Sequence, residues 1–186
     1  MNNVLIMVLL CLPLLNGCGK TEEKNPPAEP KQAKKIEVAQ SPNFYGLIEE
    51  YRTILAEDPN NLAAIIGLGN AYYDSGQWKK AIMMYEHALL IDPRNADVHT
   101  DMGTSYRNLG MPERALAEYR TALRLEPGHL NARYHMGSIY AHEKKDYRAA
   151  IRAWEELLKL APNYPQADDI RSGIAAFTQV LKKESK

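Results

Sequence analysis

Residues 96–129, ADVHTDMGTSYRNLGMPERALAEYRTALRLEPGH, decide the fold of this chain, because the same pattern recurs on both sides of them. The recurring positions in this stretch are small, aromatic or proline residues: Gly103, Tyr106, Ala115, Tyr119, Ala122 and Pro127. Each has an earlier counterpart of the same type, always at the same interval, in Gly69, Tyr72, Ala81, Tyr85, Ala88 and Pro93. A period of about 34 residues predicts stacked two-helix units rather than one closed core.

A third copy follows, with one residue inserted before its second half. It contains Gly137, Tyr140, Ala150, Trp154 and Pro162, and Leu157 stands where the other copies have alanine. Each proline ends one helix and permits the first turn of the next. Glycines at 76 and 110 mark the turn inside the first two units, and Lys144-Lys145-Asp146 replaces that glycine in the third.

These motifs resemble the tetratricopeptide repeat family over Leu62 to Tyr164. The resemblance implies an all-α, right-handed solenoid of helical hairpins, in which the glycines let two backbones approach and the aromatics fill the space beside them. It also implies that Trp78 and Tyr147 begin the second helices of their repeats.

The repeats and their flanks divide the chain into seven predicted segments. They are a signal peptide (1–17), a lipidated Cys18 with a tether (18–42), an N-terminal capping helix (43–61), three repeats (62–95, 96–129 and 130–164) and a C-terminal capping helix with tail (165–186).

The stretch from Met1 to Cys18 predicts export and lipidation. Val4 to Leu15 is an apolar run that is short for a membrane span and suits the core of a secretion signal. Leu15-Asn16-Gly17-Cys18 resembles the lipobox of bacterial lipoproteins, although Asn16 and the absence of Lys or Arg at the start depart from that pattern. An ordinary signal peptide or an uncleaved anchor is the alternative. Gly19 after the cysteine favours the outer membrane over the inner membrane in the lipoprotein family.

The segment from Gly19 to Pro42 predicts a tether. Four prolines, alternating Lys and Glu, and almost no large apolar residue leave too little surface to offset the entropy of ordering. Cleavage before Cys18 would also remove Cys11, so the mature domain would have no disulfide.

Both flanking helices are predicted to act as caps. Asn43 to Glu57 matches the second helix of a repeat without its partner, and its expected buried residues are Phe44, Leu47, Tyr51 and Ile54. Pro165 to Lys182 places Ala167, Ile170, Ile174, Phe177 and Leu181 on one helical face.

No pattern in the chain predicts catalysis or a cofactor. The formal net charge is zero, which gives no indication of nucleic-acid binding. The glycines are isolated and form no phosphate loop. His135 and His142 lie seven apart on one predicted helix and would need Glu143 or Asp101 to hold a metal. We expect instead that these two histidines and His129 are polar residues of the groove side, and we predict no metal site.

The resemblance also implies a binding groove, formed by the first helix of each repeat. Carried over residue by residue, it consists of Ile66, Asn70, Tyr73, Asp74, Thr100, Asp101, Thr104, Arg107, Asn108, Asn131, Tyr134, His135, Ser138 and His142. Such a polar surface with aromatic anchors suits an extended peptide. Asn70 can both donate and accept a hydrogen bond, and Arg107 can pair with a carboxylate. The alternative is that these residues form only a solvated face.

The resemblance therefore predicts a membrane-anchored, non-enzymatic adaptor of the bacterial cell envelope that binds a protein partner, for example in pilus or envelope assembly. Binding to chaperone C-termini is not expected, because Ile66, Asp101 and His135 replace residues of the family's two-carboxylate clamp. A metal-assisted envelope enzyme and a self-assembling structural protein, hence a homo-oligomer, are the alternatives.

Overall fold

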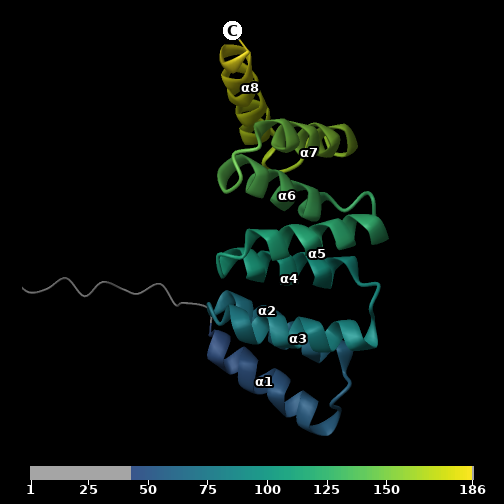
Figure 1. Cartoon of the computed structure of the whole chain (residues 1–186). Helices are drawn as coiled ribbons and strands as arrows, with labels where there is room; N and C mark the ends of the chain where they lie inside the picture. Colours follow the sequence, from purple (N-terminus) through teal and green to yellow (C-terminus); the bar gives the residue numbers. More distant parts are fainter. Residues whose placement is uncertain (1–42, 186) are drawn as a thin grey trace, which may run out of the picture. The chain divides into compact units, whose positions relative to one another are not determined.

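Residues 43–185 are described by a computed structural model and form eight α-helices without a strand (Figure 1). The helices are α1 (Phe44–Glu57), α2 (Leu62–Asp74), α3 (Trp78–Ile91), α4 (Ala96–Asn108), α5 (Pro112–Leu125), α6 (Leu130–His142), α7 (Tyr147–Leu160) and α8 (Ala167–Glu184). The predicted signal peptide, lipidated Cys18 and tether lie outside the described residues. Within residues 43–185, no helix combines the length and the apolar character that a membrane crossing requires.

The helices pack in sequence order as three hairpins, α2 with α3, α4 with α5, and α6 with α7, with α1 and α8 at the ends (Figure 1). The first helices of successive hairpins, α2, α4 and α6, also contact one another. The apolar side chains of all eight helices form three consecutive core clusters rather than one central core. The predicted all-α helical repeat solenoid is therefore confirmed, and α2, α4 and α6 together line one side of it.

At each repeated glycine of the first helix, an aromatic ring of the second helix lies directly against the backbone. A Cβ atom on Gly69 would lie 2.6 Å from Cε1 of Tyr85, and one on Gly103 would lie 2.7 Å from Cε1 of Tyr119. Both tyrosine side chains are almost completely buried. The aromatic ring thus occupies the space that the missing side chain leaves, which explains why both residue types recur at the same interval.

The turns inside the hairpins require left-handed backbone. Gly76 and Gly110 have φ values of 75° and 73°, which glycine adopts without strain. In the third hairpin, Lys145 takes this role with a φ of 53°, in a turn that is one residue longer. The inserted residue therefore falls in a turn and leaves the helices of the repeat intact.

The N-terminal cap differs from its prediction, because none of the four residues expected to be buried is fully buried: Phe44, Tyr51 and Ile54 are half-buried, and Leu47 is exposed. Ile48 of α1 is 5% exposed, whereas Leu47, which was expected to be buried, is 43% exposed. In the full repeats, the position of Leu47 is an alanine covered by the first helix of the same hairpin. Because α1 has no such helix over it among the described residues, Leu47 faces solvent, and α1 packs on α2 through Ile48, Tyr51 and Leu55.

The C-terminal cap follows its prediction closely. Ala167 and Ile170 of α8 are buried, and Ile174 packs against the third core cluster. Phe177 stacks on Tyr147, with 4.6 Å between the ring centroids. This helix therefore closes the last hairpin and contributes one wall to a hollow described below.

Candidate functional site: a pocket on the first helices of the repeats

A pocket of about 350 Å³ lies where α2, α4 and α6 come together, and we call it the central pocket. Its lining is polar and aromatic: Asn70, Tyr73, Asp74, Tyr85, Asp101, Thr104 and His135. All of these except Tyr85 belong to the groove that the sequence predicts. The structure thus brings residues from three successive repeats to one hollow.

Tyr85 is the lining residue that the sequence analysis missed, because its repeat position indicates a core role. Its ring is buried in front of Gly69, but its hydroxyl donates a hydrogen bond of 2.8 Å to Oδ1 of Asn70. One repeat later, the hydroxyl of Tyr119 lies 3.1 Å from Oγ1 of Thr104. Asn70 and Tyr85 are separated in the sequence by the same interval as Thr104 and Tyr119. This repeated interval could have indicated that the hydroxyl of Tyr85 lies beside the groove.

Asp101 is the most perturbed acid of the pocket. Burial, and to a smaller extent the carboxylates of Asp97 and Asp74, raises its pKa to about 6 against the opposing effect of His129. Within residues 43–185, no hydrogen bond or salt bridge reaches the carboxylate of Asp101, although its backbone carbonyl accepts one from Ser105. The fold therefore holds a partly buried carboxylate without a structural partner.

His135 lines the central pocket with an imidazole ring that is uncharged at neutral pH. Burial lowers the pKa of its imidazole to about 4, and the positive charge of Arg107 acts in the same direction. Its ring stacks on Tyr119 at 5.8 Å between centroids, and its Nδ1 atom is buried without a hydrogen-bond partner. The imidazole is consequently uncharged at neutral pH.

Arg107 does not lie free in the groove as the sequence analysis expected. Its guanidinium donates two hydrogen bonds to Oε1 of Glu143, at 2.9 Å from Nε and 2.7 Å from a terminal nitrogen. Glu143 follows α6 directly and comes within reach across the repeat boundary. The pairing of Arg107 with a partner's carboxylate is therefore not supported, because an internal carboxylate already occupies it.

Two hydroxyl groups of the predicted groove are also unavailable. Thr100 and Ser138 are buried, 3% and 6% exposed. Thr100 donates to the carbonyl of Ala96 and Ser138 to that of Tyr134, as hydroxyls in helices often do. Ile66 packs against the first core cluster. Thr100 and Ile66 thus belong to the support of the groove, and the hydroxyl of Ser138 is bonded within its own helix.

The remaining predicted residues lie in neighbouring hollows. Tyr134, Ser138 and His142 line a second pocket of about 250 Å³ with Trp154, Asp169, Ile170, Gly173 and Phe177. Asn131 lines a third pocket and accepts a hydrogen bond of 2.9 Å from the Tyr164 hydroxyl. Asn108 donates to the hydroxyl of Tyr73 at 3.2 Å. The predicted groove residues that line a pocket are thus divided among three pockets, and Asn108 lines none of the three.

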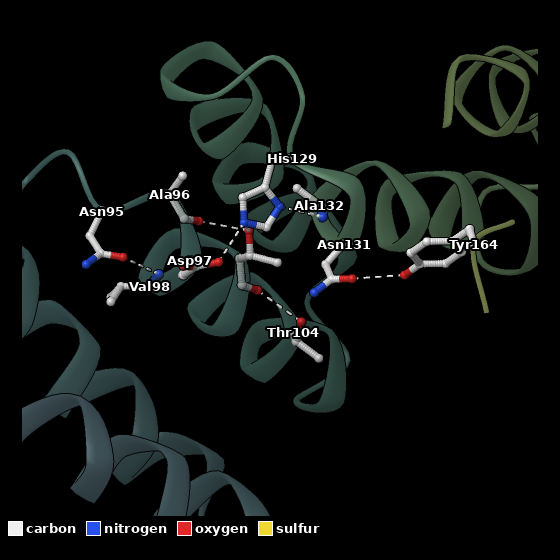
Figure 2. Close-up of polar contacts among 10 residues, drawn as sticks. Asn95, Ala96, Asp97, Val98, Thr104, His129, Asn131, Ala132 and Tyr164 are labelled. Carbon is white, nitrogen blue, oxygen red and sulfur yellow. Dashed lines mark hydrogen bonds and ion pairs between the residues drawn. The ribbon is translucent and has the colours of Figure 1, made fainter. Parts of the chain in front are cut away.

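His129 is not a groove residue, because it caps the N-terminus of α6 (Figure 2). Its Nδ1 accepts a hydrogen bond of 3.1 Å from the backbone N–H of Ala132, and its Nε2 lies 2.9 Å from Oδ1 of Asp97. Since Nδ1 accepts, the proton of the neutral ring sits on Nε2 and is donated to Asp97. Asn61 and Asn95 are the corresponding caps of the first two repeats.

The described residues contain no group of three or more His, Cys, Asp or Glu side chains placed to hold a metal ion. Of the residues proposed for the metal alternative, Glu143 is bonded to Arg107, and His135 and His142 line different pockets. The geometry of residues 43–185 therefore gives the metal-assisted reading no support.

Two family models match the sequence. One described as "TPR repeat" matches residues 69–110, and one described as "Tetratricopeptide repeat" matches residues 100–168. Together they extend over more than half of the chain. No curated protein matches the sequence significantly.

Solved structures with the same fold include three of MamA. "Crystal structure of MamA" has a TM-score of 0.61 at 21% identity, covering 76% of this chain and 91% of that one. "Crystal structure of MamA protein" has a TM-score of 0.61 at 23% identity, and the match covers 75% of this chain and 80% of that one. "MamA RS-1 ArsTM double mutant" has a TM-score of 0.60 at 19% identity, and the match covers 64% of this chain and 67% of that one. At these identities the likeness shows the fold alone.

Proposed function

Because this chain belongs to the tetratricopeptide repeat family and is a protein-interaction scaffold, we propose that it binds an extended segment of a partner protein in the central pocket. The proposal includes a non-enzymatic adaptor role in the bacterial cell envelope, for example in pilus or envelope assembly. The anchor would be acyl chains on Cys18, with the outer membrane favoured.

The observation that carries the binding proposal is the central pocket itself. The family scaffold places three first helices side by side, and here they present acceptors and aromatic groups around a hollow of about 350 Å³. Extended segments are held by side-chain hydrogen bonds and by pockets for individual side chains. Tyr73 is only partly buried at the rim of this hollow and hydrogen-bonds Asn108 of the next repeat.

The anchor proposal is supported by the sequence at Leu15 to Cys18 and by the proline-containing stretch after it. Several buried acyl chains hold a protein firmly, since each methylene contributes about 0.8 kcal/mol. The tether would then give the repeats freedom to reach a partner away from the membrane surface.

Photo-crosslinking in the producing cell tests the binding site. The full chain carries a photoreactive residue in place of Tyr73 in one variant and of Met83 in the other. Met83 lies on α3 and is 60% exposed, so it controls for random encounter. We expect a discrete protein adduct from position 73 and none from position 83. Adducts only from position 83, or none from either, would overturn the proposal.

A further inference from the structure

We infer that the central pocket takes a positively charged side chain, lysine or arginine, of the bound segment. The inference rests on the proposed function and specifies the chemistry of its ligand. It is argued from the charges that line the pocket, from the engagement of the nearby cations, and from the hydrogen-bonding groups that face the hollow.

The lining of the pocket has a net negative charge. Asp74 and Asp101 are its carboxylic acids, and no lysine or arginine lines it. His135, the remaining titratable base of the lining, is neutral at pH 7 because burial holds the pKa of its imidazole near 4. A carboxylate or phosphate entering this hollow would be repelled, whereas a cation would be attracted.

The basic groups that act on the pocket, Arg107 and His129, have partners of their own. The guanidinium of Arg107 is bonded to Glu143, and Nε2 of His129 is directed at Asp97. Within the described residues no salt bridge reaches Asp101, and His129, which lowers its pKa, is itself bonded to Asp97. A partly buried carboxylate is costly unless it is paired, so an incoming cation would relieve a cost that the free protein carries.

The uncharged groups around the two acids favour the same ligand. Oδ1 of Asn70 accepts one hydrogen bond from Tyr85 and retains a second lone pair. The hydroxyl oxygens of Tyr73 and Tyr85 are further acceptors, and the partly buried ring of Tyr73 can receive a cation on its face. A lysine ammonium brings three donors and an arginine guanidinium five, which matches a pocket rich in acceptors.

Selection from a phage-displayed library of random dodecapeptides on the full chain tests this inference. Enriched sequences are resynthesised with acetylated and amidated ends, so that only side chains can supply positive charge. In each peptide, arginine is then replaced by citrulline or lysine by acetyl-lysine. Affinities are measured for the wild type, for Asp101→Asn, and for Glu86→Gln, which changes an exposed acid of α3 outside the pocket.

We expect the wild type to enrich peptides with a basic residue whose neutralisation weakens binding at least ten-fold. The same neutralisation should change the affinity of Asp101→Asn less than two-fold and that of Glu86→Gln ten-fold. Urea unfolding of Asp101→Asn, which we expect to be at least as stable as the wild type, distinguishes a loss of preference from a loss of folding.

Three outcomes would overturn the inference. They are enrichment of neutral or acidic peptides, an equal effect of neutralisation in all three proteins, and no enrichment at all. The proposed function has a separate test, because a discrete adduct from position 73 would still show binding at the pocket. A partner captured there without a basic residue in the bound segment would leave the adaptor role standing and the charge preference refuted.

Discussion

Arg107 and Glu143 join the second repeat to the third through two hydrogen bonds onto one carboxylate oxygen. Arg107 lies near the end of α4, and Glu143 is the residue that ends α6. The pair neutralises a positive charge that acts on His135 in the central pocket. The negative character of that pocket thus depends on a contact outside its lining.

Replacement of Glu143 by glutamine should therefore weaken the binding of a basic peptide, by about three- to ten-fold, because Arg107 loses its neutralising partner. The free energy of unfolding should change by less than about 1 kcal/mol, as is usual for pairs near the surface. Fluorescence anisotropy and urea unfolding measure the two quantities. Glu113→Gln, which breaks the neighbouring pair with Lys144, is the control. Equal weakening by both changes would contradict the prediction.

Asp101→Asn should stabilise the protein at neutral and alkaline pH. The folded pKa of Asp101, about 6, exceeds its ordinary value of 3.8, so the folded state disfavours the carboxylate. The resulting loss of stability is absent below pH 4, grows through pH 6 and is complete above it. We expect the free energy of unfolding of Asp101→Asn to exceed that of the wild type by about 1–3 kcal/mol at pH 8, a range that allows for the partial exposure of the side chain. At pH 4 we expect no difference between the two proteins.

Urea unfolding of both proteins at each pH checks this expectation. The depressed pKa of His135 destabilises both of them below pH 6 and cancels in the comparison. Asp74→Asn, at an exposed position in the same pocket, should have little effect. A gain for Asp101→Asn that is the same at pH 4 and pH 8 would rule out the ionic explanation.

Gly103→Ala should destabilise the second hairpin. The added Cβ would lie 2.7 Å from the ring of Tyr119 and 3.2 Å from the carbonyl oxygen of Ala115, so backbone and ring must move apart. Overpacking of this kind costs about 1–3 kcal/mol. Gly128→Ala, where a Cβ meets open space, is the matched control and should be neutral or slightly stabilising. Thermal unfolding separates the two, and equal melting temperatures would refute the packing argument.

His129→Ala should lower the free energy of unfolding by about 1–2 kcal/mol, because the backbone N–H of Ala132 loses its cap. His129→Asn should recover most of the loss, since Asn61 and Asn95 accept from the corresponding N–H groups at 3.0 Å. Urea unfolding of the three proteins measures both changes. If asparagine were as damaging as alanine, the contact to Asp97 rather than the cap would be the main contribution.

Cys18→Ser should release the protein from the membrane fraction into the soluble periplasmic fraction, because the acylated side chain would be absent. Cell fractionation followed by immunoblotting measures the distribution. Cys11→Ser, within the apolar run, should leave the distribution unchanged. Membrane retention of Cys18→Ser at the level of the wild type would argue against the lipid anchor.

The constant interval between the repeated motifs was sufficient to predict the helices and the side of the solenoid that holds the pocket. Asn70, Asp101 and His135, which the sequence assigns to one predicted groove, line the same pocket because first-helix positions repeat with the motif. Leu47 was misplaced because a repeat pattern assumes a covering helix, and α1 has none over that residue among those described.

Other features depend on contacts that no single-residue pattern contains. The pairing of Arg107 with Glu143 requires the geometry of the longer turn after α6. The cap formed by His129 could have been inferred, since His129 stands at the same repeat position as Asn95 and Asn61. Tyr85 belongs to the core through its ring and to the pocket through its hydroxyl, and the motif indicates only the first.

Asn70, Thr104 and Ser138 occupy one register of successive repeats, each one residue after the glycine that receives an aromatic ring. The glycine and the ring maintain the shape of the hairpin, whereas Asn70 and Thr104 line the central pocket and Ser138 lines the second pocket. Directed evolution can therefore concentrate on position 70 and its counterparts and keep their neighbours constant. Under the proposed function, a small combinatorial set at these sites would change which polypeptide is bound and leave the packing of the hairpins as it is.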